Sequence, residues 1–241
     1  MSRLKWIILL AKSGITSMLK AIIFDLDGTI TKLELPLEDM RRDTKNYYIR
    51  KGLPAKLLDA ADGISSSTEK AKTYFEESGI SSQEWSRMER EIDKILSSHE
   101  GGSAQEVTLM KDSLETVSKI KEMGFKTAIL TNNGRAAVDI IAKQIPLHRY
   151  FDLIHTRHEV PNPKPFPDGL NKILRDLSVK PDESVYVGDA LIDAVAANRA
   201  QIEFWGVTTG ETSEGALREA GASEVFDRLS GIIDLARKRM N

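Results

Sequence analysis

Residues 21–29 read Ala-Ile-Ile-Phe-Asp-Leu-Asp-Gly-Thr, and this stretch decides the fold. Its first four residues are apolar, too few for a globular helix and rich in branched and aromatic side chains, which predicts a buried strand. Asp25 and Asp27 follow. Because alternate residues of an extended chain share a side, both carboxylates leave the strand end toward one point. Gly28 then permits a sharp change of direction.

Two neighbouring carboxylates repel each other, so each keeps its charge only if a cation or a basic side chain lies nearby. An arrangement of this kind suits a metal-assisted site for phosphoryl transfer. For the motif alone, the alternative is an Asp-x-Asp-Gly turn that carries no chemistry.

Three more polar motifs occur further along the chain. They are Thr131-Asn132-Asn133 after the strand-like run 127–130, Lys164-Pro165 in a proline-punctuated loop, and Gly188-Asp189 with Asp193 after the strand-like run 184–187. Each motif alone is weak evidence. A Gly-Asp-x-x-x-Asp sequence, for example, is most often a turn and a helix cap. Their order, with each at a strand end or in the loop before a helix, is a strong joint signal.

From Ser113 onward, strand-like and helix-like segments alternate, which is typical of βαβ units and a parallel sheet. We therefore predict an α/β fold with a doubly wound, Rossmann-like parallel sheet. An apolar stripe over residues 170–177 indicates one of its core-facing helices. Ligands of such sheets bind beyond the carboxyl ends of the strands, where Asp25, Thr131 and Asp189 all fall.

The alternation stops between about residues 34 and 104. This segment is polar, has apolar residues at helical spacing, and is divided by turn signals, the last at Gly101-Gly102, into about four helices. We predict a helical-bundle cap of residues 34–104 inserted after the first strand, with hinges at 31–35 and 101–105, on a core formed by residues 18–33 and 105–241.

The four motifs in this order resemble those of the haloacid dehalogenase (HAD) superfamily, over about residue 19 to the C-terminus. The helical insert resembles the cap of the phosphoglycolate phosphatase and β-phosphoglucomutase branch. This resemblance implies Mg²⁺-dependent hydrolysis of a small phosphorylated metabolite, a phosphate monoester, through an aspartyl-phosphate intermediate. It also implies that the cap closes to exclude water and carries the contacts that select the substrate.

By the same resemblance, Asp25 is the nucleophile that attacks phosphorus, and Asp27 protonates the leaving oxygen and later takes a proton from water. The expected cofactor is Mg²⁺, with the Asp25 carboxylate, the Asp27 backbone carbonyl, Asp189 and water as ligands. Thr131 and the backbone amide of Asn132 would hold the oxygens of the phosphoryl group.

The remaining motif residues would support this chemistry. Lys164 would bind the phosphate and offset negative charge on the nucleophile. Asp193, which follows Gly188 by five positions, would orient either Lys164 or a metal-bound water. Gly28 would shape the phosphate-binding loop together with Thr29, whose hydroxyl is a candidate partner for the second aspartate of the motif.

Other functions remain as alternatives. A phosphosugar mutase of the β-phosphoglucomutase type would use the same core with a different cap. A signalling receiver domain also clusters aspartates on a doubly wound sheet, but it is much shorter and has no insert after the first strand. A non-catalytic binding protein is a third alternative because fold does not determine function, although four chemically intact motifs speak against it. Asn133 stands where phosphoglycolate phosphatases often have lysine, which leaves the substrate open.

The composition excludes several further classes. The 241 residues include 34 Lys and Arg against 36 Asp and Glu, so no basic footprint for nucleic acid is visible. The absence of cysteine excludes disulfides and thiolate chemistry and fits a cytoplasmic protein. No apolar run approaches the ~20 residues that a membrane span needs. We expect a monomer or a homodimer whose partner is a small phosphorylated metabolite.

Residues 1–17 are expected to form an extension ahead of the core. The apolar run at 6–11 superficially suggests a signal peptide, but Lys12 follows at once and no small-residue cleavage pattern is present. We favour a short helix packed on the domain or an upstream start codon.

For two groups of residues outside the motifs, a structural role is expected rather than a functional one. His155 and His158 are poor evidence for a metal site. Arg41, Arg42 and Lys45 could contact an anionic end of a substrate, but a solvated helix face is the favoured interpretation.

Overall fold

A computed structural model describes residues 18–210 and 212–240 of the chain, so the expectation for residues 1–17 lies outside the described residues. A six-stranded parallel sheet has the order β5-β4-β1-β6-β7-β8. Its strands are β1 (Ala21–Phe24), β4 (Lys126–Leu130), β5 (Leu153–His155), β6 (Ser184–Gly188), β7 (Glu203–Val207) and β8 (Glu224–Phe226). The prediction of a doubly wound parallel sheet is confirmed, with the quoted stretch as a central strand.

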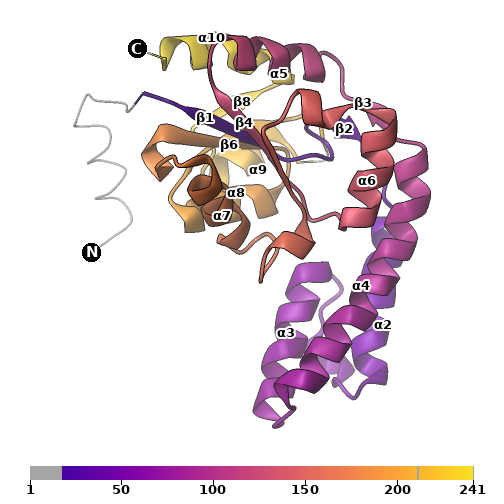
Figure 1. Cartoon of the computed structure of the whole chain (residues 1–241). Helices are drawn as coiled ribbons and strands as arrows, with labels where there is room; N and C mark the ends of the chain where they lie inside the picture. Colours follow the sequence, from indigo (N-terminus) through magenta and orange to yellow (C-terminus); the bar gives the residue numbers. More distant parts are fainter. Residues whose placement is uncertain (1–17, 211, 241) are drawn as a thin grey trace, which may run out of the picture.

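Helices cover both faces of this sheet (Figure 1). They are α5 (Ser113–Glu122), α6 (Arg135–Gln144) and α10 (Ile232–Lys238) on one face, and α7 (Asp168–Leu177), α8 (Leu191–Ala200) and α9 (Glu214–Glu219) on the other. Alternation along β1 directs Ile22 and Phe24 into the first apolar layer and Ile23 into the second. Because both faces are covered, β1 is buried throughout, as its unbroken apolar sequence predicts.

Short 3₁₀ turns connect several of these elements. They are η2 (Leu147–Arg149), η3 (Arg157–Glu159), η4 (Pro181–Glu183) and η5 (Leu229–Gly231). The sequence did not reveal β5, because three residues ending in a histidine form too short and too polar a run to be distinguished from a loop.

The segment after β1 forms a separate helical bundle, which extends away from the sheet in Figure 1. It comprises α2 (Leu37–Arg50), the 3₁₀ turn η1 (Ala55–Leu57), α3 (Ile64–Glu77) and α4 (Ser82–Gln105), and the antiparallel pair β2 (Thr31–Lys32) and β3 (Thr108–Leu109) joins its two ends. The bundle has its own apolar cluster, in which the Tyr48 and Trp85 rings stack with centroids 6.2 Å apart.

The turn predicted at Gly101-Gly102 is wrong, because α4 continues through both glycines to Gln105. Each glycine costs about 1 kcal/mol in a helix interior, so packing must compensate for the pair. The flanking residues Glu100 and Ala104 are buried where this end of α4 lies along α6. The hinge expected at 101–105 is therefore part of a helix packed on the core.

Among the described residues, none of the helices combines the length and the apolar character that crossing a membrane would require.

Candidate active site

The polar motifs converge because three neighbouring parallel strands end at one edge of the sheet. β1 pairs with β4 on one side and with β6 on the other. Asp25 follows β1, Thr131 follows β4 and Asp189 follows β6. The backbone N–H of Asp25 still donates to Val187 at 2.8 Å, so its side chain emerges where the sheet pairing ends. This is the edge at which doubly wound sheets bind their ligands.

Lys164 is a buried cation between two of the carboxylates. Its Nζ lies 2.7 Å from Asp25 Oδ1 and 2.7 Å from Asp193 Oδ1, and 3.1 Å from the hydroxyl of Tyr186. Burial lowers the pKa of Lys164, but the Asp193 and Asp25 carboxylates raise it by more, so the net shift is upward. The side chain therefore stays charged beside Asp25. Tyr186 also donates to Asp193 at 2.9 Å, and nothing in its apolar strand sequence indicated that role.

Asp25, Asp189 and Asp193 place carboxylate oxygens within 4.8 Å of one another, and all three residues are buried. Burial and the Asp193 charge raise the pKa of Asp25 well above its ordinary value, against the opposing effect of Lys164. Burial, then Asp193, raises the pKa of Asp189 to about 7. One lysine among three acids leaves negative charge that a divalent cation would offset.

Asp193 is already committed to protein partners. Besides Lys164 and Tyr186, it accepts a hydrogen bond from the backbone N–H of Ala190 at 3.0 Å. A Cβ on Gly188 would lie 2.6 Å from Asp193 Oδ2, so this approach requires glycine. Of the two roles considered for Asp193, the geometry matches contact with Lys164.

The chemistry of the donor set fits Mg²⁺, which prefers hard oxygen ligands. Asp189 is held for such a role by two close backbone segments. A Cβ would lie 2.4 Å from its Oδ2 if added at Gly28, and 1.8 Å from it if added at Gly210. The hydroxyl of Thr29 donates to Asp189 Oδ1 at 3.1 Å. The predicted contact of Thr29 with Asp27 is therefore wrong, because the chain reverses at Gly28 and turns Thr29 toward β6.

Asp27 occupies a separate environment from the three clustered acids. Its Oδ1 accepts from the hydroxyl of Thr31 at 3.0 Å, and its Oδ2 accepts from Asn133 Nδ2 at 2.6 Å. Burial raises the pKa of Asp27 to about 6, and the two hydrogen bonds act in the opposite direction. A carboxyl group with a pKa near neutrality can both give and take a proton.

The Thr131-Asn132-Asn133 loop connects these groups. The Asn132 side chain donates from Nδ2 to the Lys164 carbonyl and accepts from the Lys164 N–H, both at 2.9 Å, so it fixes the loop that carries the lysine. Thr131 Oγ1 accepts from the Asn133 N–H at 3.1 Å. The side-chain roles of Asn132 and Asn133 were not foreseen; the motif position drew attention only to the Asn132 backbone.

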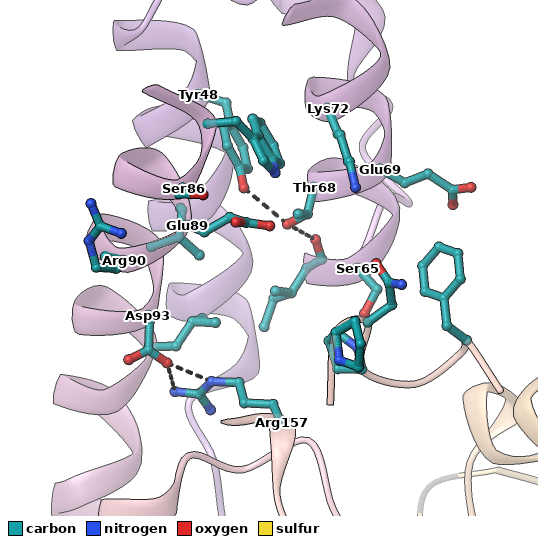
Figure 2. Close-up of a pocket in the computed structure, with 18 of the residues that line it drawn as sticks. Tyr48, Ser65, Thr68, Glu69, Lys72, Ser86, Glu89, Arg90, Asp93 and Arg157 are labelled. Atoms are coloured by element: carbon teal, nitrogen blue, oxygen red, sulfur yellow. Dashed lines mark hydrogen bonds and ion pairs between the residues drawn. The ribbon is translucent and has the colours of Figure 1, made fainter. Parts of the chain in front are cut away.

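A cavity of about 780 Å³ lies between α3, α4 and the loop that follows η3. Figure 2 shows Lys72, Thr68 and Glu89 directed toward its interior, with Arg157 at its base. Asp25, Asp27 and Asp189 do not line it, but Pro163 and Phe166 do, on either side of the Lys164-Pro165 pair. The Ser65 hydroxyl of α3 donates to the Lys164 carbonyl at 3.2 Å, so the cavity adjoins the lysine loop.

Ordinary protein partners account for His155, His158, Lys45 and Arg42. His155 lies 3.2 Å from Asp176, while His158 lies 2.6 Å from Asp93. Lys45 donates to two backbone carbonyls of the bundle, at Asp59 and Ala60. Arg41 and Arg42 are exposed, and Arg42 pairs with Asp39 on the same helix, which agrees with a solvated face.

Residues 22–207 match the model of the family described as haloacid dehalogenase-like hydrolase. The chain belongs to this family. A curated relative, the pyrophosphatase PpaX of Bacillus thuringiensis (strain Al Hakam), is 26% identical over 218 residues, covering 90% of this chain and 96% of the relative. The expectation of a hydrolase enzyme of the HAD superfamily is thus confirmed.

Solved structures of family members share the fold. One assigned as a β-phosphoglucomutase from Bacteroides vulgatus has a TM-score of 0.65 at 20% identity, covering 96% of this chain and 95% of its own. A predicted phosphoglycolate phosphatase from Haemophilus somnus 129PT has a TM-score of 0.61 at 20% identity, covering 92% and 99%. These likenesses establish the architecture of the chain. The two structures carry names from the phosphoglycolate phosphatase and β-phosphoglucomutase branch that the sequence resembles.

Proposed function

We propose that this HAD-family hydrolase is an Mg²⁺-dependent phosphatase that cleaves a small phosphate monoester through an aspartyl phosphate on Asp25. The observation that carries the proposal is that two carboxylates at one strand end lie in different environments. Asp25 is buried against the Lys164 cation at 2.7 Å, whereas Asp27 stands apart with a pKa of about 6. One group suits attack on phosphorus and the other suits proton transfer.

In the first step, an Asp25 oxygen bonds to phosphorus as the bond from phosphorus to the alcohol oxygen breaks. Asp27 gives its proton to that oxygen, so the leaving group departs as a neutral alcohol. Lys164, the Thr131 hydroxyl and the Asn132 N–H stabilise the three phosphoryl oxygens as their charge develops. When bound by Asp25, Asp189 and the Asp27 carbonyl, Mg²⁺ would offset the repulsion between carboxylate and phosphate.

In the second step, Asp27 takes a proton from a water molecule while that water attacks the phosphorus. The bond between phosphorus and Asp25 breaks, which releases inorganic phosphate and restores the Asp25 carboxylate. Lys164 again lies where it can offset charge on the departing carboxylate, because Asp193 and Tyr186 hold its Nζ in place. The proton that Asp27 takes from water replaces the one it gave to the leaving group, so Asp27 is protonated again for the next cycle.

The chain would divide into a core of residues 18–33 and 105–241 and a cap of residues 34–104. We infer that the cavity between α3, α4 and the lysine loop receives the alcohol part of the substrate, because it adjoins Lys164 through Ser65. Pyrophosphate and phosphoglycolate are the first compounds to test, because the names of relatives include a pyrophosphatase and a phosphoglycolate phosphatase. A cytoplasmic location and a monomeric or homodimeric state complete the proposal.

The test is a screen of phosphorylated metabolites with Mg²⁺, scored by phosphate release, with Asp25→Asn as the control. The variant should fold normally and lose nearly all activity, because an amide cannot attack phosphorus. Retention of a tenth of wild-type turnover would remove Asp25 from this role. Formation of an isomerised sugar phosphate in place of inorganic phosphate would indicate a mutase.

A further inference from the structure

We propose that Arg157 and Glu100 form a positioning pair through which helix α4 holds Asn133 against Asp27. The inference rests on the proposed function, in which Asp27 handles the proton of the leaving group. Neither residue of the pair touches Asp27 through a hydrogen bond of its own; the pair acts through the backbone on either side of Asn133.

The pair is a buried ion pair between the helical bundle and the core. Glu100 lies on α4 with its side chain 3% exposed, and Arg157 begins η3 with its side chain 9% exposed. The guanidinium also contacts Asp93 at 2.7 Å and the hydroxyl of Ser97 at 3.0 Å, both on α4 (Figure 2 shows the Asp93 contact). A planar guanidinium held at several points has little freedom to move.

The pair holds the two peptide groups that flank Asn133. Arg157 Nη1 donates to the Asn132 carbonyl at 3.0 Å, and the Arg157 N–H donates to the Asn133 carbonyl at 3.2 Å. Glu100 Oε2 accepts from the Gly134 N–H at 3.0 Å. The remaining group, the Asn133 N–H, donates to Thr131 Oγ1. Both peptide planes are therefore fixed, and three of their four contacts come from the pair.

Gly134 gives the pair the room it needs. A Cβ at this position would lie 2.7 Å from Arg157 Nη2 and 3.2 Å from Glu100 Oε2. The backbone can therefore approach both charged groups only without a side chain. Through this close approach the ion pair contacts the loop of residues 132–134 and does more than connect α4 to η3.

The outcome of this arrangement is the short contact between Asn133 and Asp27. Asn133 is 3% exposed, and its Nδ2 lies 2.6 Å from Asp27 Oδ2. A hydrogen bond weakens steeply once distance and angle leave their optimum, so a shift of ~1 Å in the loop would break this contact and leave the Asp27 carboxyl held, among the described residues, by Thr31 alone. Helix α4 thus contributes to proton transfer from outside the sheet.

A purely structural tie between bundle and core would predict a different kinetic pattern. Loss of the contact between Asn133 and Asp27 should harm substrates with poor leaving groups, which need a proton, far more than nitrophenyl esters, whose nitrophenolate leaves without one. A general loss of structure should harm both classes alike.

The experiment compares Arg157→Lys and Glu100→Gln with the control Arg239→Lys. Arg239 also makes a partly buried ion pair, 3.0 Å from Glu203, far along the chain from the loop. The kcat/KM for an alkyl phosphate should fall by about 30-fold or more, and that for 4-nitrophenyl phosphate by no more than about threefold. The control should keep both values. Equal losses on the two substrates would overturn the proposal.

A double-mutant cycle tests whether the pair acts through Asn133. Asn133→Ala should show the same dependence on leaving group, and Arg157→Lys should add nothing to that dependence in the Asn133→Ala background. Additive changes in leaving-group dependence would contradict the proposal.

A readout without turnover separates this inference from the proposed function. The side-chain amide signal of Asn133 in a ¹H–¹⁵N spectrum, assigned by its loss in Asn133→Ala, should move in Arg157→Lys and Glu100→Gln but not in Arg239→Lys. An unmoved Asn133 signal in the Arg157 and Glu100 variants would overturn the positioning pair. Failure of the wild type to hydrolyse either ester would reject the proposed phosphatase function, and the Asn133 signal would still test the pair. Circular dichroism confirms folding, and the near-isosteric Glu100→Gln decides if Arg157→Lys unfolds.

Discussion

Substitution of Gly210 by alanine should disable the proposed Mg²⁺ site while leaving the fold intact. Gly210 lies in the loop after β7, where its backbone touches the Asp189 carboxylate. A Cβ would sit 1.8 Å from Asp189 Oδ2 and 2.6 Å from its Cγ. An unstrained carbon–oxygen contact needs about 3.4 Å, so the carboxylate or the loop must move by about 1.6 Å.

A displacement of this size matters more for Mg²⁺ than for stability. Mg²⁺ demands near-ideal geometry at ~2.1 Å from its ligands, so a ligand shifted by more than an ångström is lost or badly placed. Disturbing the residues that orient a ligand commonly costs 10–100-fold in metal affinity, and we expect a loss in that range. The local overpacking should cost about 1–3 kcal/mol of unfolding free energy, which a folded domain tolerates.

The assay is calorimetric titration of Mg²⁺ together with the Mg²⁺ dependence of phosphate release. Gly215→Ala is the matched control, because a Cβ there meets nothing within 4 Å. Wild-type Mg²⁺ affinity in a folded Gly210→Ala variant would refute the assignment of Asp189 as a ligand or the rigidity of the loop. A loss in Gly215→Ala as well would show that the effect is not specific to the contact with Asp189.

Three further results are expected. Excess chelator should abolish activity and Mg²⁺ should restore it, and Asp189→Ala should raise the Mg²⁺ requirement; full activity in chelator would exclude the metal. Asn132→Ala removes both hydrogen bonds to the Lys164 backbone, so kcat should fall about tenfold on alkyl and aryl esters alike. Burial lowers the pKa of His155, so the unfolded chain binds its proton more readily and stability should fall as pH drops below about 6.5. The free energy of unfolding in urea should fall less between pH 8 and pH 5.5 in His155→Gln than in the wild type. His148→Gln is the control, because His148 is exposed, and it should behave like the wild type. Equal falls in all three proteins would contradict this account.

The sequence by itself determined the parallel sheet, apart from β5, and the sheet edge at which the polar motifs lie. Apolar runs such as Ala21–Phe24 are short, β-rich and followed by polar motifs, so local pattern alone indicates strands that end in functional groups. The carboxyl ends of parallel strands share one edge, which is why Asp25, Thr131 and Asp189 could be expected together.

Only the tertiary structure decided which groups pair within that site. Asn133 reaches Asp27 across 106 positions, and Arg157 reaches Glu100 across 57, while Thr29 turns to Asp189 and not to its neighbour in the motif. The glycines at 101 and 102, which in isolation favour a turn, stay helical because α4 packs along α6. Each of these outcomes depends on the packing of elements far apart in the chain. Local preferences of about 1 kcal/mol are smaller than the free energy of burying a side chain or pairing a buried charge, so packing overrides them.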